Sequence, residues 1–278
     1  MNVLGFSGLV YAVSVVAGFL GALTGLGGGV VVTPVLTVLL GVDLHYAIGA
    51  TLVSVIATSS GAAAAYLKEG FSNIRAGMFL EVATTLGAVA GAHLTAVVPA
   101  STLAVIFGGV LLYSAWQSLR QRTPAREAPP DPLAARLRLE GTYPGPEGPI
   151  HYHVCRVKAG FSLMFGAGVL SGLLGIGSGA LKVIAMDQVM RIPFKVSTTT
   201  SNFMIGVTAA ASAGVYLRRG YIDPGLAMPV MLGVLTGSML GAEQLMGAKT
   251  RKLRLIFAAV VGLLAAEMIY NGFSGGIG

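Results

Sequence analysis

The chain has 278 residues, of which 54% are hydrophobic and only 10% are charged. Soluble globular domains carry about 25% charged residues, so this composition excludes an ordinary cytosolic enzyme and a disordered chain. The formal net charge of +7 comes from short basic runs between apolar segments, which indicates cytoplasmic loops of a membrane protein rather than a nucleic-acid-binding surface.

Long apolar stretches follow one another in both halves of the chain. They cover residues 3–23, 30–41, 46–67, 76–98 and 101–119, and then 159–174, 180–190, 194–217, 225–246 and 253–271. Most approach the ~20 residues that a helix needs to cross a bilayer. The stretches 30–41 and 180–190 are about half as long, and each follows a glycine cluster. Short, glycine-interrupted segments at matching places in two halves predict broken helices around a transport site.

The two halves are related by a constant offset of 150 residues. Identical residues at this offset include Gly25 and Gly175, Gly27 and Gly177, Gly29 and Gly179, Thr58 and Thr208, Tyr66 and Tyr216, and Gly87 and Gly237. The offset has no gap and keeps the glycines in phase, which predicts a structural repeat. Gly87 and Gly91 also have the spacing that lets two helix backbones approach closely.

A polar, proline-rich segment at residues 120–158 separates the halves. Apolar residues alternate along it on both sides of a Pro/Gly turn: Leu137, Leu139 and Tyr143, then Ile150, Tyr152 and Val154. This alternation predicts a small β-hairpin outside the membrane. His151 and His153 share one face of the second strand, where a metal pair is the alternative. No carboxylate or Cys partner is evident nearby, so we expect no metal and no cofactor.

Basic residues set the predicted orientation. Those of the 120–158 segment place it in the cytoplasm by the positive-inside rule. If 159–174 and 180–190 form a re-entrant hairpin, the later basic residues also fall inside, except Arg218 and Arg219. Each half then has one hairpin and three full spans, and an odd number of crossings inverts the second half relative to the first.

The predicted fold is therefore an all-α polytopic membrane protein of two inverted repeats, residues 1–119 and 159–278, joined by a cytoplasmic linker at 120–158. Each repeat has a glycine-broken re-entrant helical hairpin and three transmembrane helices. We expect a multi-pass protein of a bacterial or archaeal cytoplasmic membrane. Its expected partners are the lipid bilayer and a small anionic substrate, and no nucleic acid.

The clusters Gly25–Gly29 and Gly175–Gly179 have a physical use in such a fold. A chain that reverses inside the bilayer exposes backbone N–H groups, which is tolerated only inside protein or beside a water-filled cavity. The helix that restarts after each cluster offers free N–H groups and the positive end of its dipole, and both bind anions. The repeat would bring the two clusters together near the midplane as a pocket for a small oxyanion. The alternative is a pair of tight turns without a ligand.

Polar side chains beside the clusters complete the predicted site. The candidate substrate-binding residues are Thr24, Gly25, Gly27, Gly28, Gly29 and Thr51 in the first half, and Gly175, Gly177, Ser178, Gly179, Lys182, Thr200, Ser201 and Asn202 in the second. Hydroxyl and amide groups can donate to the oxygens of a sulfur or phosphorus oxyanion in place of water. For any single Ser or Thr, helix capping or interhelical hydrogen bonding is the alternative.

Ionisable residues are rare inside the predicted spans, and each is a functional candidate because its burial is costly. They are Glu81, His93, Lys182, Asp187, Glu243 and Glu267. An ammonium at Lys182, in the first turn of a short helix, opposes the helix dipole and costs about 2.5–3.5 kcal/mol in the bilayer. Asp187 lies on another helical face, so we expect a bound anion to compensate this charge. The alternative is that Lys182 loses its proton when the site is empty and regains it with the substrate. His93 and Glu243 occupy equivalent repeat positions and are the proton-coupling candidates, with interfacial solvation near the span ends as the alternative.

The glycine pattern resembles that of a known membrane family. Gly-Leu-Gly-Gly-Gly followed by Pro34 and Thr51, repeated as Gly-Ile-Gly-Ser-Gly and Thr200-Ser201-Asn202, is similar to the TauE/SafE sulfite-exporter-like family. The resemblance covers both halves but not the linker. It implies a secondary transporter of sulfite or of organosulfur anions such as sulfoacetate. The second half departs from the pattern, with Ser178 in place of a glycine, Ile184 in place of a proline, and Lys182 added.

No motif in the sequence predicts catalysis. The zinc-protease, Walker and serine-elbow motifs are absent, and Ile176 replaces the glycine that an intramembrane serine-protease pattern needs before Ser178. We therefore predict no enzyme. The predicted function is proton-coupled secondary transport of a small sulfur-containing anion, sulfite or an organosulfonate, bound near the midplane between the two broken helices. An anion channel without coupling is the alternative.

Overall fold

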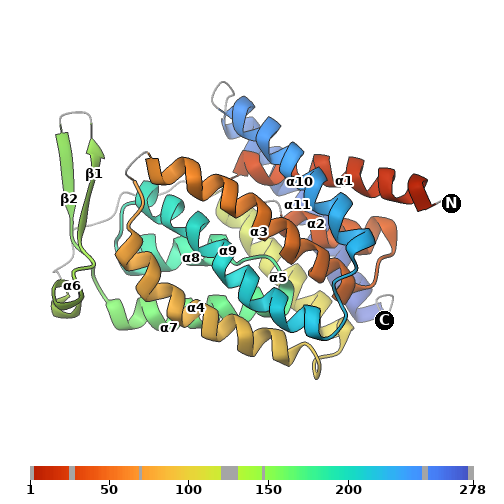
Figure 1. Ribbon diagram of the computed structural model, residues 1–278, viewed down its shortest axis with the longest axis horizontal. Coiled ribbons are helices and arrows are strands. Elements are labelled where there is room, and N and C mark those ends of the chain that lie inside the picture. The colour runs from red at the N-terminus through yellow and green to blue at the C-terminus, as the bar shows by residue number, and fades with distance from the viewer. Residues whose placement is uncertain are drawn as a thin grey trace.

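The computed structural model describes residues 3–24, 29–68, 71–119, 131–145, 148–245 and 250–274. In some of these stretches it describes the backbone and not the side chains. Helices make up most of it, lying side by side along the long axis of the molecule, and a small β-hairpin projects from one end (Figure 1). The mostly helical fold and the hairpin confirm the prediction at that level. Two described helices, α4 (Ile74–Leu94) and α7 (Val157–Leu174), are long and apolar enough to cross a membrane by length and composition.

The remaining elements follow the predicted apolar stretches closely. In the first half they are α1 (Val3–Thr24), α2 (Gly29–Pro34), the π-helical turn η1 (Val35–Leu39), α3 (Leu44–Lys68) and α5 (Ala100–Leu119). In the second half they are α8 (Gly179–Ile184), the π-helical turn η2 (Ala185–Val189), α9 (Phe194–Arg218), α10 (Pro224–Leu245) and α11 (Thr250–Ser274). The bounds of α8, η2 and α9 are those of α2, η1 and α3 shifted by 150 residues.

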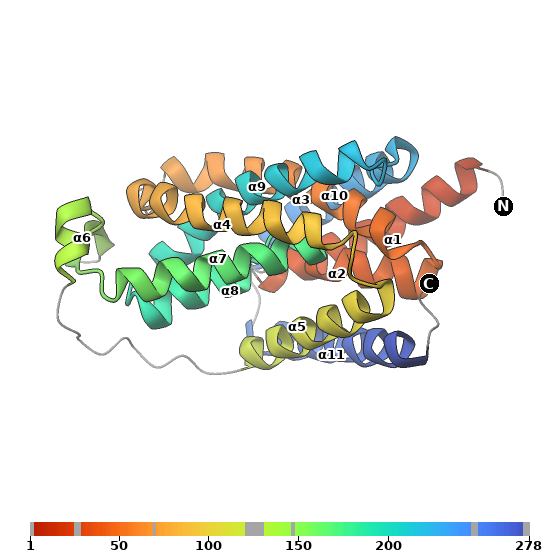
Figure 2. The same cartoon turned by 90° about the horizontal axis from the view of Figure 1, so that it is seen from below.

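The two halves exchange packing partners: the first helix of each half packs against a helix of the other half. Helix α1 packs along α10, α7 packs along α4, and α3 contacts α9. Helices α5 and α11 pair with each other and form a layer of their own (Figure 2). In both views α1 starts at the end of the molecule that carries the N-terminus, whereas α7 starts at the hairpin end, so the two helices run in opposite directions.

Glycines allow the exchanged pairs to pack at backbone distance. A Cβ atom added to Gly87 on α4 would lie 2.2 Å from the carbonyl oxygen of Phe165 on α7. At the equivalent contact, a Cβ on Gly237 of α10 would lie 2.0 Å from the carbonyl oxygen of Val15 on α1. Both distances are too short for any side chain, so these positions require glycine. The same close contact therefore stabilises both halves.

The linker folds into a short helix and the predicted hairpin. Strands β1 (Gly141–Gly145) and β2 (Gly148–Tyr152) are antiparallel, with Tyr143 opposite Ile150. The expectation that Leu137 belongs to the first strand is wrong, because it ends helix α6 (Pro132–Leu137). The Asp131 side chain caps α6 by accepting from Leu133 N at 2.9 Å, and it accepts from Val157 N at the start of α7 at 2.8 Å.

Asn73 attaches the hairpin to the helices. Its side chain caps α4 by accepting from Ala76 N, and its amide group donates to the Leu139 carbonyl at 2.8 Å and to the Tyr152 hydroxyl at 2.7 Å. Burial raises the pKa of the Tyr152 hydroxyl, and the hydrogen bond from Asn73 lowers it by less. His153 lies 2.9 Å from Glu140, a carboxylate partner that sequence reasoning missed.

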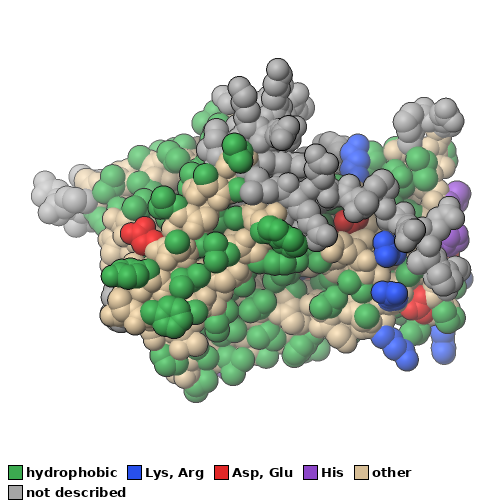
Figure 3. Space-filling view, turned by 180° about the vertical axis from the view of Figure 1, so that it is seen from behind, with side chains coloured by type: hydrophobic (Ala, Val, Ile, Leu, Met, Phe, Trp, Pro, Cys, Tyr) green, Lys and Arg blue, Asp and Glu red, His purple; other side chains and the backbone are tan. Residues whose placement is uncertain are grey.

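Charge is distributed unevenly along the molecule. Exposed basic side chains gather at the hairpin end: Arg75, Arg136, Arg138, Arg156, Lys158 and Lys195. Figure 3 shows this blue cluster beside the histidines, with hydrophobic side chains over much of the rest of the face. Arg218 and Arg219 lie at the opposite end, where Arg219 donates to the last carbonyls of α4.

Candidate anion-binding site

Gly29, the described residue of the first glycine cluster, lies beside the second glycine turn inside the helix bundle. A Cβ added to Gly29, at the start of α2, would lie 3.8 Å from the carbonyl oxygen of Gly175, in the turn between α7 and α8. Val55 of α3 packs against both, since its side chain would lie 2.5 Å from a Cβ on Gly29 and 3.2 Å from one on Gly177. Residues that lie far apart in the chain therefore form one small region beside α3 and α9.

The second turn has left-handed backbone at three positions. Gly175 has φ +68°, Gly177 has φ +67° and Ser178 has φ +47°. Glycine adopts this conformation freely, but a residue with a side chain pays about 1–3 kcal/mol. The position equivalent to Ser178 in the first half is Gly28, a residue type without this cost. Ser178 therefore brings a hydroxyl to the turn at the expense of stability.

Two buried hydroxyls at this turn have no hydrogen-bond partner among the described residues. They are Ser171 Oγ, in the last turn of α7, and Ser178 Oγ. The side chains are 0% and 2% exposed, respectively. Ser14 and Ser72 share this state but belong to other parts of the chain. A buried polar atom without a protein partner is uncommon in native proteins, and a water, an ion or a ligand can supply the partner.

Other predicted ligands contact the turns or their supports. Ser201 of α9 donates to the carbonyl of Gly179 at 3.2 Å, and Thr51 of α3 accepts from Thr33 of α2 at 2.8 Å. Thr200 accepts from Asn73 N at 3.0 Å, so it holds the connection into α4. Asn202 follows in α9 and is half-buried.

Part of the first glycine cluster lies outside the described residues. Gly25, Gly27 and Gly28 lie outside the described residues, and only the backbone of Thr24 is described, at the end of α1. The structure thus brings together Gly29, Thr51, Gly175, Gly177, Ser178, Gly179 and Ser201. Sequence reasoning missed Ser171, although it also precedes the second glycine cluster.

The charge of Lys182 is compensated inside the protein. Its ammonium is fully buried, lies 3.6 Å from Glu81 Oε2 on α4 and donates to Thr208 of α9. Thr208 in turn donates to Glu81 Oε1 at 2.5 Å. The expectation that a bound anion compensates Lys182 is therefore wrong for the structure described here, because a carboxylate from another helix does so.

The predicted proton-coupling residues lie elsewhere. His93 is exposed at the end of α4, and its Nδ1 atom lies 2.8 Å from the Val89 carbonyl oxygen. This position matches the interfacial alternative. Glu243 belongs to α10, but its side chain lies outside the described part of the chain.

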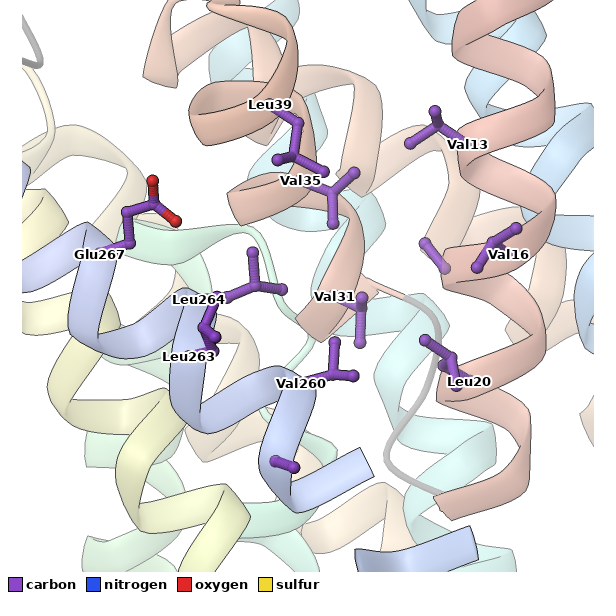
Figure 4. Close-up of a pocket in the computed structure, with 12 residues that line it drawn as sticks. Val13, Val16, Leu20, Val31, Val35, Leu39, Val260, Leu263, Leu264 and Glu267 are labelled. Carbon is purple, nitrogen blue, oxygen red and sulfur yellow. The ribbon is translucent and has the colours of Figure 1, made fainter. Parts of the chain in front are cut away.

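A cavity of about 590 Å³ lies between α1, the α2–η1 segment and α11 (Figure 4). Aliphatic side chains such as Val13, Val31, Val35 and Leu264 line it, and Glu267 is the one charged residue among its described lining residues. An oxyanion needs hydrogen-bond donors, which this lining does not offer. The cavity is therefore unsuited to the anion, and the glycine turns remain the candidate site.

Comparison with known proteins identifies the family. Residues 10–268 match the family described as "Sulfite exporter TauE/SafE". The chain belongs to the TauE/SafE sulfite exporter family. The resemblance drawn from the glycine pattern is thereby confirmed, together with the assignment to membrane transport.

Several bacterial proteins are similar along most of this TauE/SafE chain. "Probable membrane transporter protein YunE" of Bacillus subtilis (strain 168) is 27% identical over 271 residues, 95% of this chain and 97% of that protein. "Probable membrane transporter protein YdhB" of the same organism is 26% identical over 236 residues, 84% and 87% of the two chains. A "Probable membrane transporter protein" of Xylella fastidiosa (strain 9a5c) is 26% identical over 260 residues, 92% of each chain. No solved structure was found to match.

Membrane location explains the surface of this TauE/SafE protein. Met78, Val82 and Leu86 lie four residues apart on α4, and each is more than half exposed. Such a stripe would be costly in water but suits a helix that faces lipid. Between and behind these residues, α4 buries Glu81 and Thr84. One helix thus separates the lipid from the polar interior.

Proposed function

We propose that this protein is a secondary transporter of a small sulfur-containing oxyanion, which binds at the second glycine turn, beside Gly29. The observation that carries the proposal is the pair of buried, unpartnered hydroxyls of Ser171 and Ser178 at the second turn. Hydroxyl groups and backbone N–H groups are donors that can replace water around an oxyanion. No catalytic step is assigned to this site.

The family supports sulfur chemistry in the substrate. Its description names a sulfite exporter, and the relatives carry the name of membrane transporters. Sulfite and the organosulfonates share a pyramidal or tetrahedral sulfur with three oxygens, which present the same acceptors to hydroxyl and backbone N–H donors. We include both in the proposed substrate class, with a coupled proton.

The proposed topology is that of two inverted repeats, residues 1–119 and 159–278, with re-entrant hairpins at α1–α2 and α7–α8 and a cytoplasmic linker at 120–158. The opposite directions of α1 and α7 support it. The basic hairpin end supports a cytoplasmic location for that end, in the cytoplasmic membrane of a bacterium or archaeon. Inverted repeats around a midplane site would allow access from each side in turn.

Uptake into proteoliposomes tests the proposal. Purified protein should accumulate radiolabelled sulfite or sulfoacetate, faster under an imposed proton gradient, and should discriminate against sulfate. Ser171→Ala combined with Ser178→Gly should reduce anion affinity at least tenfold, about 1.4 kcal/mol. Ser162→Ala is the matched control, because Ser162 is an exposed serine on the same helix α7.

Three results would count against the proposal in different ways. Flux of the parent protein that ignores the proton gradient would favour a channel. Flux unaffected by the double serine change would place the anion elsewhere. Absence of any flux of sulfite, sulfoacetate or sulfate would contradict transport of a small sulfur oxyanion altogether.

A further inference from the structure

The ion pair between Glu81 and Lys182 is unusual for a membrane interior. The Lys182 side chain is fully buried and that of Glu81 is 9% exposed. Taking two charges out of water costs several kcal/mol per ion, which mutual attraction repays only with good geometry and further hydrogen bonds. Glu81 receives such bonds from Thr84 at 3.0 Å, Thr85 at 3.2 Å and Thr208 at 2.5 Å.

The fold itself does not require this pair. At the offset of 150 residues, Glu81 corresponds to Met231 and Lys182 to Val32. Thr208, which bridges the two charges, corresponds to Thr58. The equivalent helices α10 and α2 thus form with apolar residues at both of the corresponding positions. Apolar replacement of a buried ion pair is often neutral or stabilising, so a role other than stability is indicated for the charges.

The backbone of Lys182 is hydrogen-bonded directly to the second glycine turn. Lys182 N donates to the Ser178 carbonyl at 3.0 Å, so Lys182 lies one helical turn after the strained serine. Its side chain then reaches Glu81 on α4 and Thr208 on α9. A change in the charge of Glu81 therefore acts on a residue that is bonded directly to the turn.

Other titratable groups do not take the place of this pair. Those described on α4 and on the elements packed against the pair, α7, α8, η2 and α9, are Arg75, His93, Lys158, Asp187, Lys195, Tyr216 and Arg218. Most lie at the helix ends, and Tyr216 donates to the carbonyls of Gly172 and Leu173. Among the described side chains, Lys182 is the cation that pairs with Glu81.

Building on the proposed function, we propose that Glu81 takes up the coupled proton and that Lys182 transmits this event to the anion site. The proton binds to the Glu81 carboxylate and converts it to a neutral carboxylic acid. Lys182 then keeps a positive charge without a counter-ion, one helical turn from Ser178. An anion at the turn supplies that counter-charge.

Proton and anion therefore bind cooperatively, and each raises the affinity of the other by the same factor. The charge balance fixes a further consequence. The empty site holds one carboxylate and one ammonium, which sum to zero. The loaded site holds a neutral carboxyl group, one ammonium and the anion, which also sum to zero for a monovalent substrate. Transport of a monovalent sulfonate with one proton is then electroneutral.

Isethionate binding to the purified full chain in nanodiscs, measured at about pH 6 and about pH 8, tests this role. A sulfonate remains ionised throughout this range, so any pH dependence belongs to the protein. The parent should bind at least tenfold more tightly at the lower pH. Glu81→Gln, which copies the protonated state, should bind equally at both pH values and as tightly as the parent at the lower one.

Two further variants protect the test against misfolding. Glu81→Gln combined with Lys182→Met leaves no buried charge, so it should stay folded, and it should bind weakly and without pH dependence. Glu267→Gln is the matched control, because it removes another carboxylate from a membrane helix and should retain the parent's pH dependence. If either Glu81 variant keeps the parent's pH dependence, the proposed role of Glu81 is wrong. If the parent binds neither isethionate nor sulfite, the proposed function fails, and this inference fails with it.

Discussion

The two halves of this transporter use one scaffold but place different chemistry on it. Helices α2, η1 and α3 reappear as α8, η2 and α9 at a fixed offset, and glycine contacts of the same closeness join α4 to α7 and α10 to α1. The second turn, however, has Ser178 where the first has Gly28, and Lys182 where the first has Val32. A symmetric fold thus carries an asymmetric polar site.

This difference separates the residues that the fold needs from those that the chemistry needs. Features present in both halves, such as Gly87 and Gly237, allow the helices to pack. Features that the repeat does not share, such as the Glu81–Lys182 pair, are dispensable for the helical arrangement, since α10 and α2 form with apolar residues at the equivalent positions. Replacing residues of one half by their counterparts tests this division.

The largest effect is expected when one partner of the buried pair is removed. Lys182→Met should destabilise the protein by about 3–5 kcal/mol, because Glu81 would remain buried without its counter-ion. Glu81→Met combined with Lys182→Val introduces at each position the residue of its counterpart, Met231 or Val32, and should restore at least the parent's stability. Unfolding in detergent, followed by circular dichroism, measures both. A single variant as stable as the parent would show that the pair is not held as described.

The next effect concerns the glycine contacts that both halves share. Gly87→Ala and Gly237→Ala should each cost about 1–3 kcal/mol, because the added methyl group meets a backbone oxygen that cannot move easily. The two losses should be similar. Gly109→Ala on α5 is the control, since a Cβ there meets nothing within 4 Å. A harmless change at either contact would contradict the packing of that half.

A smaller effect is expected at the start of α4. Asn73 caps α4, and its counterpart Asp223 caps α10 by accepting from Gly225 N at 2.7 Å. Asn73→Asp should retain the cap but lose the two hydrogen bonds that the amide donates to the hairpin, at about 0.5–1.5 kcal/mol each. Protease cleavage of the hairpin should therefore accelerate while the helices stay intact. Unchanged cleavage would mean that other contacts attach the hairpin.

The smallest expected change has the opposite sign. Ser178→Gly introduces the residue type of the first turn and removes a left-handed non-glycine residue, so it should stabilise the protein by about 1 kcal/mol. The same change should weaken anion binding. Thermal unfolding without and with sulfite measures the two effects on one sample. A loss of stability on introducing glycine would show that the serine hydroxyl has a structural partner.

Local patterns in the sequence were sufficient for the helices and the glycine turns. Apolar runs bounded by glycine, proline or charge predict helices at nearly the observed positions, because burial in lipid or protein requires little else. The secondary structure of the linker was harder to predict from sequence. Asp131 and Pro132 are a helix start signal, but the alternation around Leu137 favoured a strand, and the cap decided otherwise.

The site was predictable only in part. The second glycine cluster identified the turn between α7 and α8, because left-handed backbone has a strong sequence preference. The partner of Lys182 could not be found in this way, because Glu81 lies on a helix distant in sequence and no local spacing joins them. Comparison of each charged position with its apolar counterpart, Val32 or Met231, would have marked both charges as a related pair.

The most direct test of the central claim is the position of the bound anion. Selenite is a close analogue of sulfite, and its selenium gives an anomalous diffraction signal. We predict one selenium peak within hydrogen-bonding distance of the Ser171 and Ser178 hydroxyls, and its loss in the Ser171→Ala, Ser178→Gly double variant. A peak in the apolar cavity between α1 and α11, or one that persists in the double variant, would contradict the assignment of the anion to the second glycine turn.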